Sequence, residues 1–329
     1  MNTYQKILAT FTLFAISAAL IEALVLSRRQ PASFDWGAYW ASLGVAVGRR
    51  ITDFVLLAFA MPGGQWLYEH RLISADVNTW WGVLLLFVGL EFFYYWYHRL
   101  SHEVRWFWAT HAVHHSPNQM NLSTAYRLGW TSKLAGALVF YLPLCALGYT
   151  PQVVIFAYGI NLLYQFWVHN QWIPPLGVLE GIFNTPSSHR VHHAANIDYL
   201  DANCGGVLVV FDRLFGTYIP ESKAVPCRYG WVHPITSHNP FVIALQQWIY
   251  LLRDLKGARN VRECFGYLVN PPGWVPEGEG STTAEMRARV REQMAGKVAG
   301  GTAMHLPGAS GNDAGYASTL TQNQVNTNF

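Results

Sequence analysis

The histidines of this chain fall into three clusters, and their spacing constrains the fold more than any other feature. The first cluster has the pattern H-x-x-x-H, and the other two repeat the pattern H-x-x-H-H. Because side chains three and four residues apart share a face of a helix, the pattern predicts helices whose imidazoles point the same way. Eight of the 13 histidines belong to the clusters, namely His98, His102, His111, His114, His115, His189, His192 and His193.

Clustered imidazoles of this kind predict a metal site. Burying many titratable rings together without a shared partner is costly. A metal removes that cost, because neutral imidazole is a good ligand for iron, zinc and copper. With His169, which follows a further apolar segment, the clusters supply enough ligands for two metals.

Two familiar metal-site patterns are absent from the sequence. It has no Glu-x-x-His, the pattern typical of ferritin-like carboxylate centres. Glu103 follows His102, but no second histidine comes at the spacing of a zinc protease. A dinuclear centre dominated by imidazole remains, and residue chemistry alone does not separate iron from zinc.

The composition indicates a membrane protein. Only 12% of residues are charged, whereas a soluble domain carries about 25%. The chain also contains 14 Trp and 17 Tyr, residues that suit the membrane interface. The net charge of +3 and the lack of a long basic stripe argue against nucleic acid as a partner.

Several apolar segments predict helices that span a membrane. The second of them is interrupted by Arg49, Arg50 and Asp53 and is the weakest. The fold class that we predict is therefore all-α, an integral membrane helical bundle with four to five spans. The expected spans are residues 9–27, 43–61, 79–97, 134–148 and 153–168.

The order of the spans brings the histidines to one face of the membrane. His98 closes the third span, and the fourth and fifth form a hairpin that returns the chain to the same side at His169. Most of the arginines that flank the spans fall on that side, so the positive-inside rule makes it cytoplasmic. We expect a multi-pass protein with a cytosolic, histidine-rich helical cap that holds a dinuclear metal site.

These motifs resemble those of the membrane-bound fatty acid hydroxylase/sterol desaturase superfamily. Its members carry H-x-x-x-H and two H-x-x-H-H motifs around a di-iron centre, and they use O₂ on lipid C–H bonds. The resemblance covers roughly residues 89–218 and is greatest to the alkylglycerol monooxygenase-like members. It rests on Tyr-Tyr-Trp-Tyr-His98-Arg, Asn184-Thr-Pro-Ser-Ser-His189 and Asp201-Ala-Asn203-Cys-Gly, among other segments.

The resemblance implies a set of site residues. It implies a functional, catalytic role for Glu103, and Asn203, Tyr94 and Tyr97 could orient the ligands. Where related hydroxylases often have H-x-x-x-H, this chain has Gln165-x-x-x-His169, so either one ligand is missing or Gln165 lies behind the ligands. The implied ligands of two Fe ions per chain are His98, His102, His111, His114, His115, His169, His189, His192 and His193.

The resemblance also implies an activity, the O₂-dependent hydroxylation of a lipid C–H bond. Electrons must come from an external donor, because the sequence has no Gly-x-Gly-x-x-Gly and no haem-attachment motif. A pterin such as tetrahydrobiopterin, a ferredoxin or a cytochrome would serve. Two alternatives stay open: a lipid desaturase with the same centre, and a non-enzymatic metal-binding membrane protein.

We expect four parts along the chain. Residues 1–78 hold the N-terminal spans, and residues 79–220 form the fatty acid hydroxylase-type catalytic domain. Residues 221–295 form a cytosolic C-terminal cap, in which apolar residues at helical spacing predict a helix over 240–255. Residues 296–329, rich in small and polar residues, form a disordered tail.

Overall fold

A computed structural model describes residues 3–299 and the side chains of residues 10–53 and 61–295. Over these residues the regular elements are all helices, and extended backbone pairs only in isolated bridges, so the all-α prediction is confirmed. The longer helices are α1 (Thr3–Arg29), α2 (Trp36–Glu69), α3 (Trp80–Glu103), α6 (Pro151–Val168), α9 (Pro240–Gly257) and α11 (Thr283–Ala299). The shorter ones are α4 (Arg105–His111), η1 (Leu122–Tyr126), η2 (Ala137–Tyr141), α5 (Leu142–Ala146), η3 (Gly177–Leu179), α7 (Pro186–His192), α8 (Val210–Leu214) and α10 (Val261–Val269).

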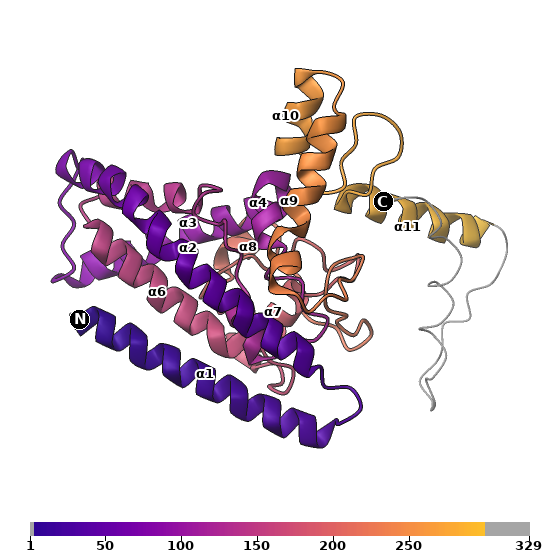
Figure 1. The fold of residues 1–329 in the computed structure, drawn as a ribbon, viewed down its shortest axis with the longest axis horizontal. Helices are drawn as coiled ribbons and strands as arrows, with labels where there is room; N and C mark the ends of the chain where they lie inside the picture. Colours follow the sequence, from indigo (N-terminus) through magenta and orange to yellow (C-terminus); the bar gives the residue numbers. More distant parts are fainter. Residues whose placement is uncertain (1–2, 300–329) are drawn as a thin grey trace. The chain divides into compact units, whose positions relative to one another are not determined.

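Residues 3–287 form one compact unit, which contains all the clustered histidines. Within it α1, α2 and α6 lie side by side, and α3 packs against α6 (Figure 1). The helices α3 and α6 both begin beside the connection that joins α2 to α3, where Leu72 N donates to Ala146 O. They therefore run in the same direction, and both end at histidines.

Polar caps fix where these helices begin. The side chains of Thr79, Thr150 and Thr185 accept hydrogen bonds from the first turns of α3, α6 and α7. Pro151 and Pro186 are the first residues of α6 and α7, where proline's missing N–H costs nothing. The three helices that carry or lead to the histidines therefore begin at defined residues.

The apolar residues inside the first H-x-x-H-H motif anchor the histidine turn to the rest of the fold. Ala112 and Val113 are buried in a core cluster with Val45 of α2 and Ile243 of α9. Trp231 Nε1 donates to Ala112 O at 2.6 Å. The helix predicted over residues 240–255 is thus confirmed as α9, which packs on α2 and α4.

The predicted fourth span is wrong. Residues 134–148 do not form one helix, because η2 and α5 cover only Ala137–Ala146 in two short pieces. Ten residues of α-helix reach about 15 Å, half of a hydrocarbon core of about 30 Å. Leu142 and Pro143 begin the second piece, and proline favours such a break.

Among the described helices, one is both long and apolar enough to cross a membrane, Thr10–Arg29 within α1. That is weak support for a bundle, since a signal sequence near the N-terminus passes the same test. The predicted spans in α2, α3 and α6 are long helices, and their membrane crossing stays a prediction. Of the predicted tail, residues 296–299 belong to α11, and residues 300–329 lie outside the described residues.

Candidate metal centre

All nine predicted histidines come together in the structure, in two adjoining groups. They come from the end of α3, from α4 and the turn after it, from the C-cap of α6, and from α7 and its C-cap. Within each group the nearest ring nitrogens all lie within 4.8 Å of one another. The five-histidine group consists of His98, His102, His111, His115 and His192, and the four-histidine group of His114, His169, His189 and His193.

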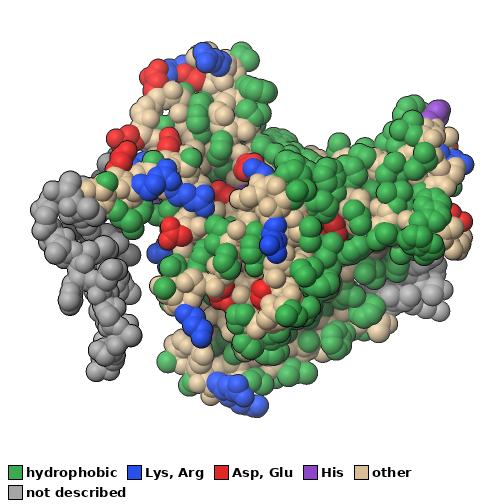
Figure 2. Space-filling model, turned by 180° about the vertical axis from the view of Figure 1, so that it is seen from behind, with side chains coloured by type: hydrophobic (Ala, Val, Ile, Leu, Met, Phe, Trp, Pro, Cys, Tyr) green, Lys and Arg blue, Asp and Glu red, His purple; other side chains and the backbone are tan. Residues whose placement is uncertain are grey.

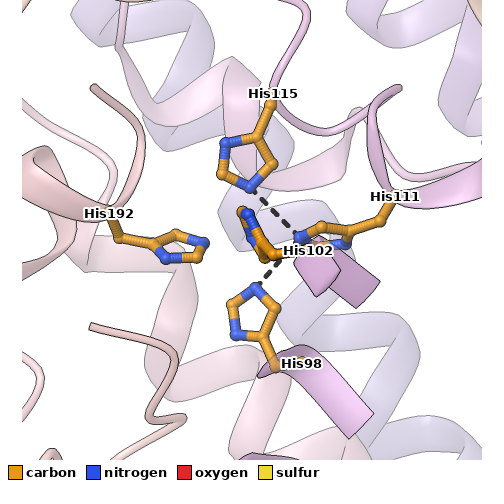
Figure 3. A group of neighbouring side chains, drawn as sticks. All are labelled: His98, His102, His111, His115 and His192. Carbon is orange, nitrogen blue, oxygen red and sulfur yellow. Dashed lines mark hydrogen bonds between the residues drawn. The ribbon is translucent and has the colours of Figure 1, made fainter. Parts of the chain in front are cut away.

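Figure 3 shows the five-histidine group, whose rings converge on a common centre. His111 Nε2 lies 3.0 Å from His98 Nε2 and 3.1 Å from His115 Nε2. In the four-histidine group, His169 Nε2 lies 3.2 Å from His114 Nε2 and 2.9 Å from His189 Nε2. The two groups touch, because the rings of His115 and His193 stack with centroids 4.4 Å apart.

Helical geometry explains how each H-x-x-H-H motif serves both groups. Residues four apart share a group, as His111 does with His115, and His189 with His193. The middle histidine of each motif, His114 or His192, belongs to the other group. With a period of 3.6 residues, the side chains three and four positions on lie about 60° and about 40° to opposite sides of the first one, and therefore about 100° apart. The two motifs therefore interlock the two groups.

Hydrogen bonds on the outer side of the rings leave nitrogen lone pairs directed inward. His169 Nδ1 donates to Gln165 O at 2.7 Å, and His98 Nδ1 donates to Cys204 O at 2.8 Å. A neutral imidazole with a proton on Nδ1 has its free lone pair on Nε2, the atom that faces the group. This arrangement is the usual one for histidines that bind metals.

Burial keeps the imidazoles of His98, His169 and His189 neutral, and two other inner nitrogens have no hydrogen-bond partner. Desolvation is the main cause that lowers the pKa of His98 and His189 well below its usual range and that of His169 to about 4. His102 Nε2 and His192 Nε2 are buried without a hydrogen bond in the described structure. An all-nitrogen donor set with unpaired atoms suits iron, zinc or copper, so these residues fit a pair of metal ions.

The structure places the other predicted site residues around the groups. Gln165 lies behind His169, because its backbone oxygen accepts from that ring while its side chain bonds Tyr94 and Asn161. Tyr94 OH donates to Gln165 Oε1 at 2.8 Å, so Tyr94 supports a histidine through Gln165. Tyr97 is buried beside Phe140 and reaches neither group through a hydrogen bond in the described structure.

The structure does not bring Glu103 together with the histidines. Its carboxylate accepts from Arg99 Nε at 2.9 Å, and its side chain is 39% exposed. Both residues belong to α3, four positions apart, which is the ordinary spacing of a surface ion pair. The catalytic role of Glu103 stays a prediction, and this geometry gives it no support.

We expect Glu103→Gln to keep most of the turnover. An exposed pair of this kind contributes roughly 0.2–1 kcal/mol to stability, so the variant should also unfold almost as the parent does. Steady-state turnover and thermal unfolding of both proteins check this expectation. A severe loss of turnover in a folded, metal-loaded variant would restore the catalytic role.

The residues that sequence reasoning missed contact partners that lie far from them along the chain. Asp201 Oδ1 is 3.3 Å from His102 Nδ1, and Glu91 joins α3 to α6 through Asn161. Asp201 stands eight residues after His193, in the segment Asp201-Ala-Asn203-Cys that supported the resemblance. A carboxylate in that segment could have been predicted to accept a hydrogen bond from a ligand histidine, because histidines that bind metals often donate to carboxylates.

One cavity opens onto both groups. Its empty space is about 650 Å³ including the open mouth, and it is lined by residues of α2, α3, α4, α6 and the segments between them. Its wall contains His98 and His111 from the five-histidine group and His114 and His169 from the four-histidine group. The fold and the site thus define an all-helical protein with two adjoining histidine groups at the end of a cavity.

Comparison with known proteins shows what this part of the chain is similar to. Residues 83–217 match the family model described as fatty acid hydroxylase. The chain is 41% identical over 239 residues to alkylglycerol monooxygenase of Danio rerio. This match covers 71% of the present chain and 52% of the Danio rerio protein. It is 35% identical over 269 residues to alkylglycerol monooxygenase of Homo sapiens. That match covers 80% of the present chain and 59% of the human protein.

A shorter match links the chain to ornithine lipid hydroxylase OlsE of Rhizobium tropici, 32% identical over 136 residues and 41% of each chain. No solved structure matches. The chain spans about half the length of the curated alkylglycerol monooxygenases that it matches. Residues 83–217 are therefore similar to fatty acid hydroxylase domains, and the predicted resemblance to alkylglycerol monooxygenases is confirmed.

Proposed function

We propose that the chain is an O₂-dependent lipid monooxygenase with one iron in each histidine group. The observation that carries the proposal is the cavity whose wall contains histidines of both groups. A molecule bound in that cavity lies against both metal positions at once. When bound, two irons would supply the reaction with O₂ that protein side chains cannot perform.

The cavity lining suits a lipid that is attacked near a polar group. Ala125, Leu128 and Leu162 offer an apolar wall for a hydrocarbon segment. Tyr94, Tyr158 and Thr110 are among the polar side chains that line the same cavity. An apolar pocket with a few polar groups orients a ligand and excludes water. The names of the relatives lead us to propose an alkylglycerol ether lipid as substrate.

Isotope labelling tests the proposed reaction. With ¹⁸O₂, a monooxygenase places one labelled oxygen in the product, and hydroxylation at an ether carbon gives a hemiacetal that collapses to a labelled aldehyde. Because aldehydes exchange oxygen with water, the product should be reduced at once to the alcohol. We expect a labelled alcohol from an alkylglycerol, and an unlabelled product with a new double bond would show a desaturase instead.

The electron donor can be assigned in the same assay. The described chain offers no cofactor fold of its own, so we propose an external donor, and tetrahydrobiopterin is the first choice. Turnover with the reduced pterin, but not with a reduced ferredoxin or cytochrome, is the expected result. The opposite preference would favour a lipid hydroxylase of another type. A protein that binds metal and turns over no lipid with any donor would favour the non-enzymatic alternative.

We also propose that α1, α2, α3 and α6 cross a membrane and hold the histidine groups at its cytoplasmic side. Hydrophobic side chains cover much of the face in Figure 2. In α3, Trp80, Val83 and Leu84 are at least half exposed, which is costly in water but not in lipid. The inner faces of α3 and α6 carry polar residues such as Glu91 and Asn161, which lowers their average hydropathy without exposing them to lipid.

Cysteine labelling tests this topology. Leu72 precedes α3 and is 82% exposed, whereas Val178 follows α6 and is 88% exposed. In a background with Cys227→Ser and Cys264→Ser, we expect Leu72→Cys and Val178→Cys to react from opposite sides of sealed vesicles. Cys145 and Cys204 are buried and should stay silent. Reaction of both new cysteines from one side would contradict the proposed bundle.

A further inference from the structure

One short loop contacts the outer ring nitrogen, Nδ1, of three histidines in the five-histidine group. His98 Nδ1 donates to Cys204 O at 2.8 Å, and His192 Nδ1 donates to Ala202 O at 2.8 Å. His102 Nδ1 lies 3.3 Å from Asp201 Oδ1. Residues 201–204, which we call the 201–204 loop, thus accept from three rings that come from two different helices.

The backbone of this loop has an unusual shape. Asp201 and Asn203 have φ angles of 57° and 55°, in the left-handed region. They are the two non-glycine residues of the described chain with positive φ. Asp and Asn tolerate this conformation better than other residues with a side chain. The strain is maintained by the surroundings, as expected at a functional site.

Two buried side chains brace the loop. Asn203 Nδ2 donates to Ser188 O at 3.0 Å, and Asn203 Oδ1 accepts from Ile219 N at 2.8 Å. Asp212 accepts from Cys204 N at 2.6 Å and from Gly205 N at 2.8 Å. The acceptors for the three histidines are therefore held in a fixed arrangement, and Asn203 orients ligands through the loop.

The four-histidine group is supported differently. Its outer hydrogen bond from His169 goes to a backbone oxygen of α6. Among the nine histidines in the described structure, only His102 is paired with a carboxylate. A carboxylate accepts and does not donate, so His102 carries its proton on Nδ1 and directs the Nε2 lone pair inward. The negative charge behind the ring also makes that nitrogen a stronger donor to a metal.

We propose that Asp201 is a positioning residue for His102 and makes the five-histidine group the tighter of the two metal positions. The proposal rests on the proposed function, since it requires that both groups bind metal. Removing a hydrogen-bond partner of a ligand histidine typically lowers metal affinity about 10- to 100-fold. The effect should be confined to one metal of the two, because Asp201 contacts one group.

Metal release to a chelator tests the proposal without an activity assay. We would load the full chain with two metals and follow release from the parent, from Asp201→Asn and from Asp201→Ala. Asp201→Asn keeps the shape of the side chain and tolerates the left-handed backbone, so it should fold. Asp198→Asn is the matched control, because Asp198 is exposed in the same segment and contacts no histidine through its side chain in the described structure.

We expect the parent to release its metals in two phases. Asp201→Asn and Asp201→Ala should accelerate the slower phase about 10- to 100-fold and leave the faster phase unchanged, and Asp198→Asn should match the parent. In Mössbauer spectra of the iron-loaded variants, the signal of one iron should change and the other should not. Equal acceleration of both phases, or none, would overturn the proposal. A parent that binds fewer than two metals would instead refute the proposed function.

Discussion

Alanine in place of His169, or of His111, abolishes turnover and removes one metal from the chain. This result is expected because each of these rings lies at the centre of its group. His169 Nε2 is within hydrogen-bond distance of two other histidines of the four-histidine group, and His111 Nε2 of two others of the five-histidine group. Loss of either metal removes half of a dinuclear centre. We expect turnover to fall at least about a thousandfold, which corresponds to about 4 kcal/mol of transition-state stabilisation.

Metal content and turnover of the two variants should be measured on the same preparations. His238→Ala is the matched control, because His238 is exposed and pairs with Asp35 away from both groups. It should retain both metals and turn over like the parent. If His169→Ala and His111→Ala kept two metals and full turnover, the assignment of the groups as ligands would be wrong.

The second large effect is expected at Glu91, a carboxylate in α3 that is 1% exposed. Its Oε2 accepts from Val207 N and Leu208 N, both at 2.8 Å, and its Oε1 accepts from Asn161 Nδ2 at 2.5 Å. Glu91→Ala leaves three donors without this partner, the side chain of buried Asn161 and the backbone amides of half-buried Val207 and Leu208. Since each costs about 1–3 kcal/mol, we expect a loss of at least about 3 kcal/mol in the free energy of unfolding.

Thermal and denaturant unfolding of the purified variants in detergent measures this loss. Glu69→Ala is the matched control, because Glu69 lies exposed at the end of α2 and accepts only from Gln65 among the described contacts. It should change stability by less than about 0.5 kcal/mol. If Glu91→Ala proved as stable as Glu69→Ala, the buried hydrogen bonds of Glu91 would not support the fold.

The sequence allowed the histidine set to be predicted because the helical period acts locally. Pairs four residues apart, such as His98 and His102, fall in one group whatever the rest of the chain does. The sequence did not reveal that the middle histidine of each H-x-x-H-H motif, His114 or His192, belongs to the other group. That division depends on how α4 and α7 face each other, which is a tertiary property.

Contacts between distant segments explain the other failures. Glu91 interrupts an apolar segment when hydropathy is read along the chain, yet in space it ties α3 to α6 and to residues 207 and 208. Asp201 reaches His102 across 99 positions of sequence, as the residue numbers show. Glu103 is the opposite case, because it adjoins a histidine in sequence while its carboxylate accepts from Arg99, and its catalytic role stays a prediction. The fourth span failed because an apolar segment can also pack as two short helices inside a fold.

Metal stoichiometry tests the central claim most directly. The chain should be purified without oxygen and without added metal-binding tags, and its metal content compared with its protein content from quantitative amino-acid analysis. Two adjoining groups of five and four histidines predict two metals per chain, with iron in the active protein. A single tightly bound zinc, with turnover indifferent to iron, would contradict the account.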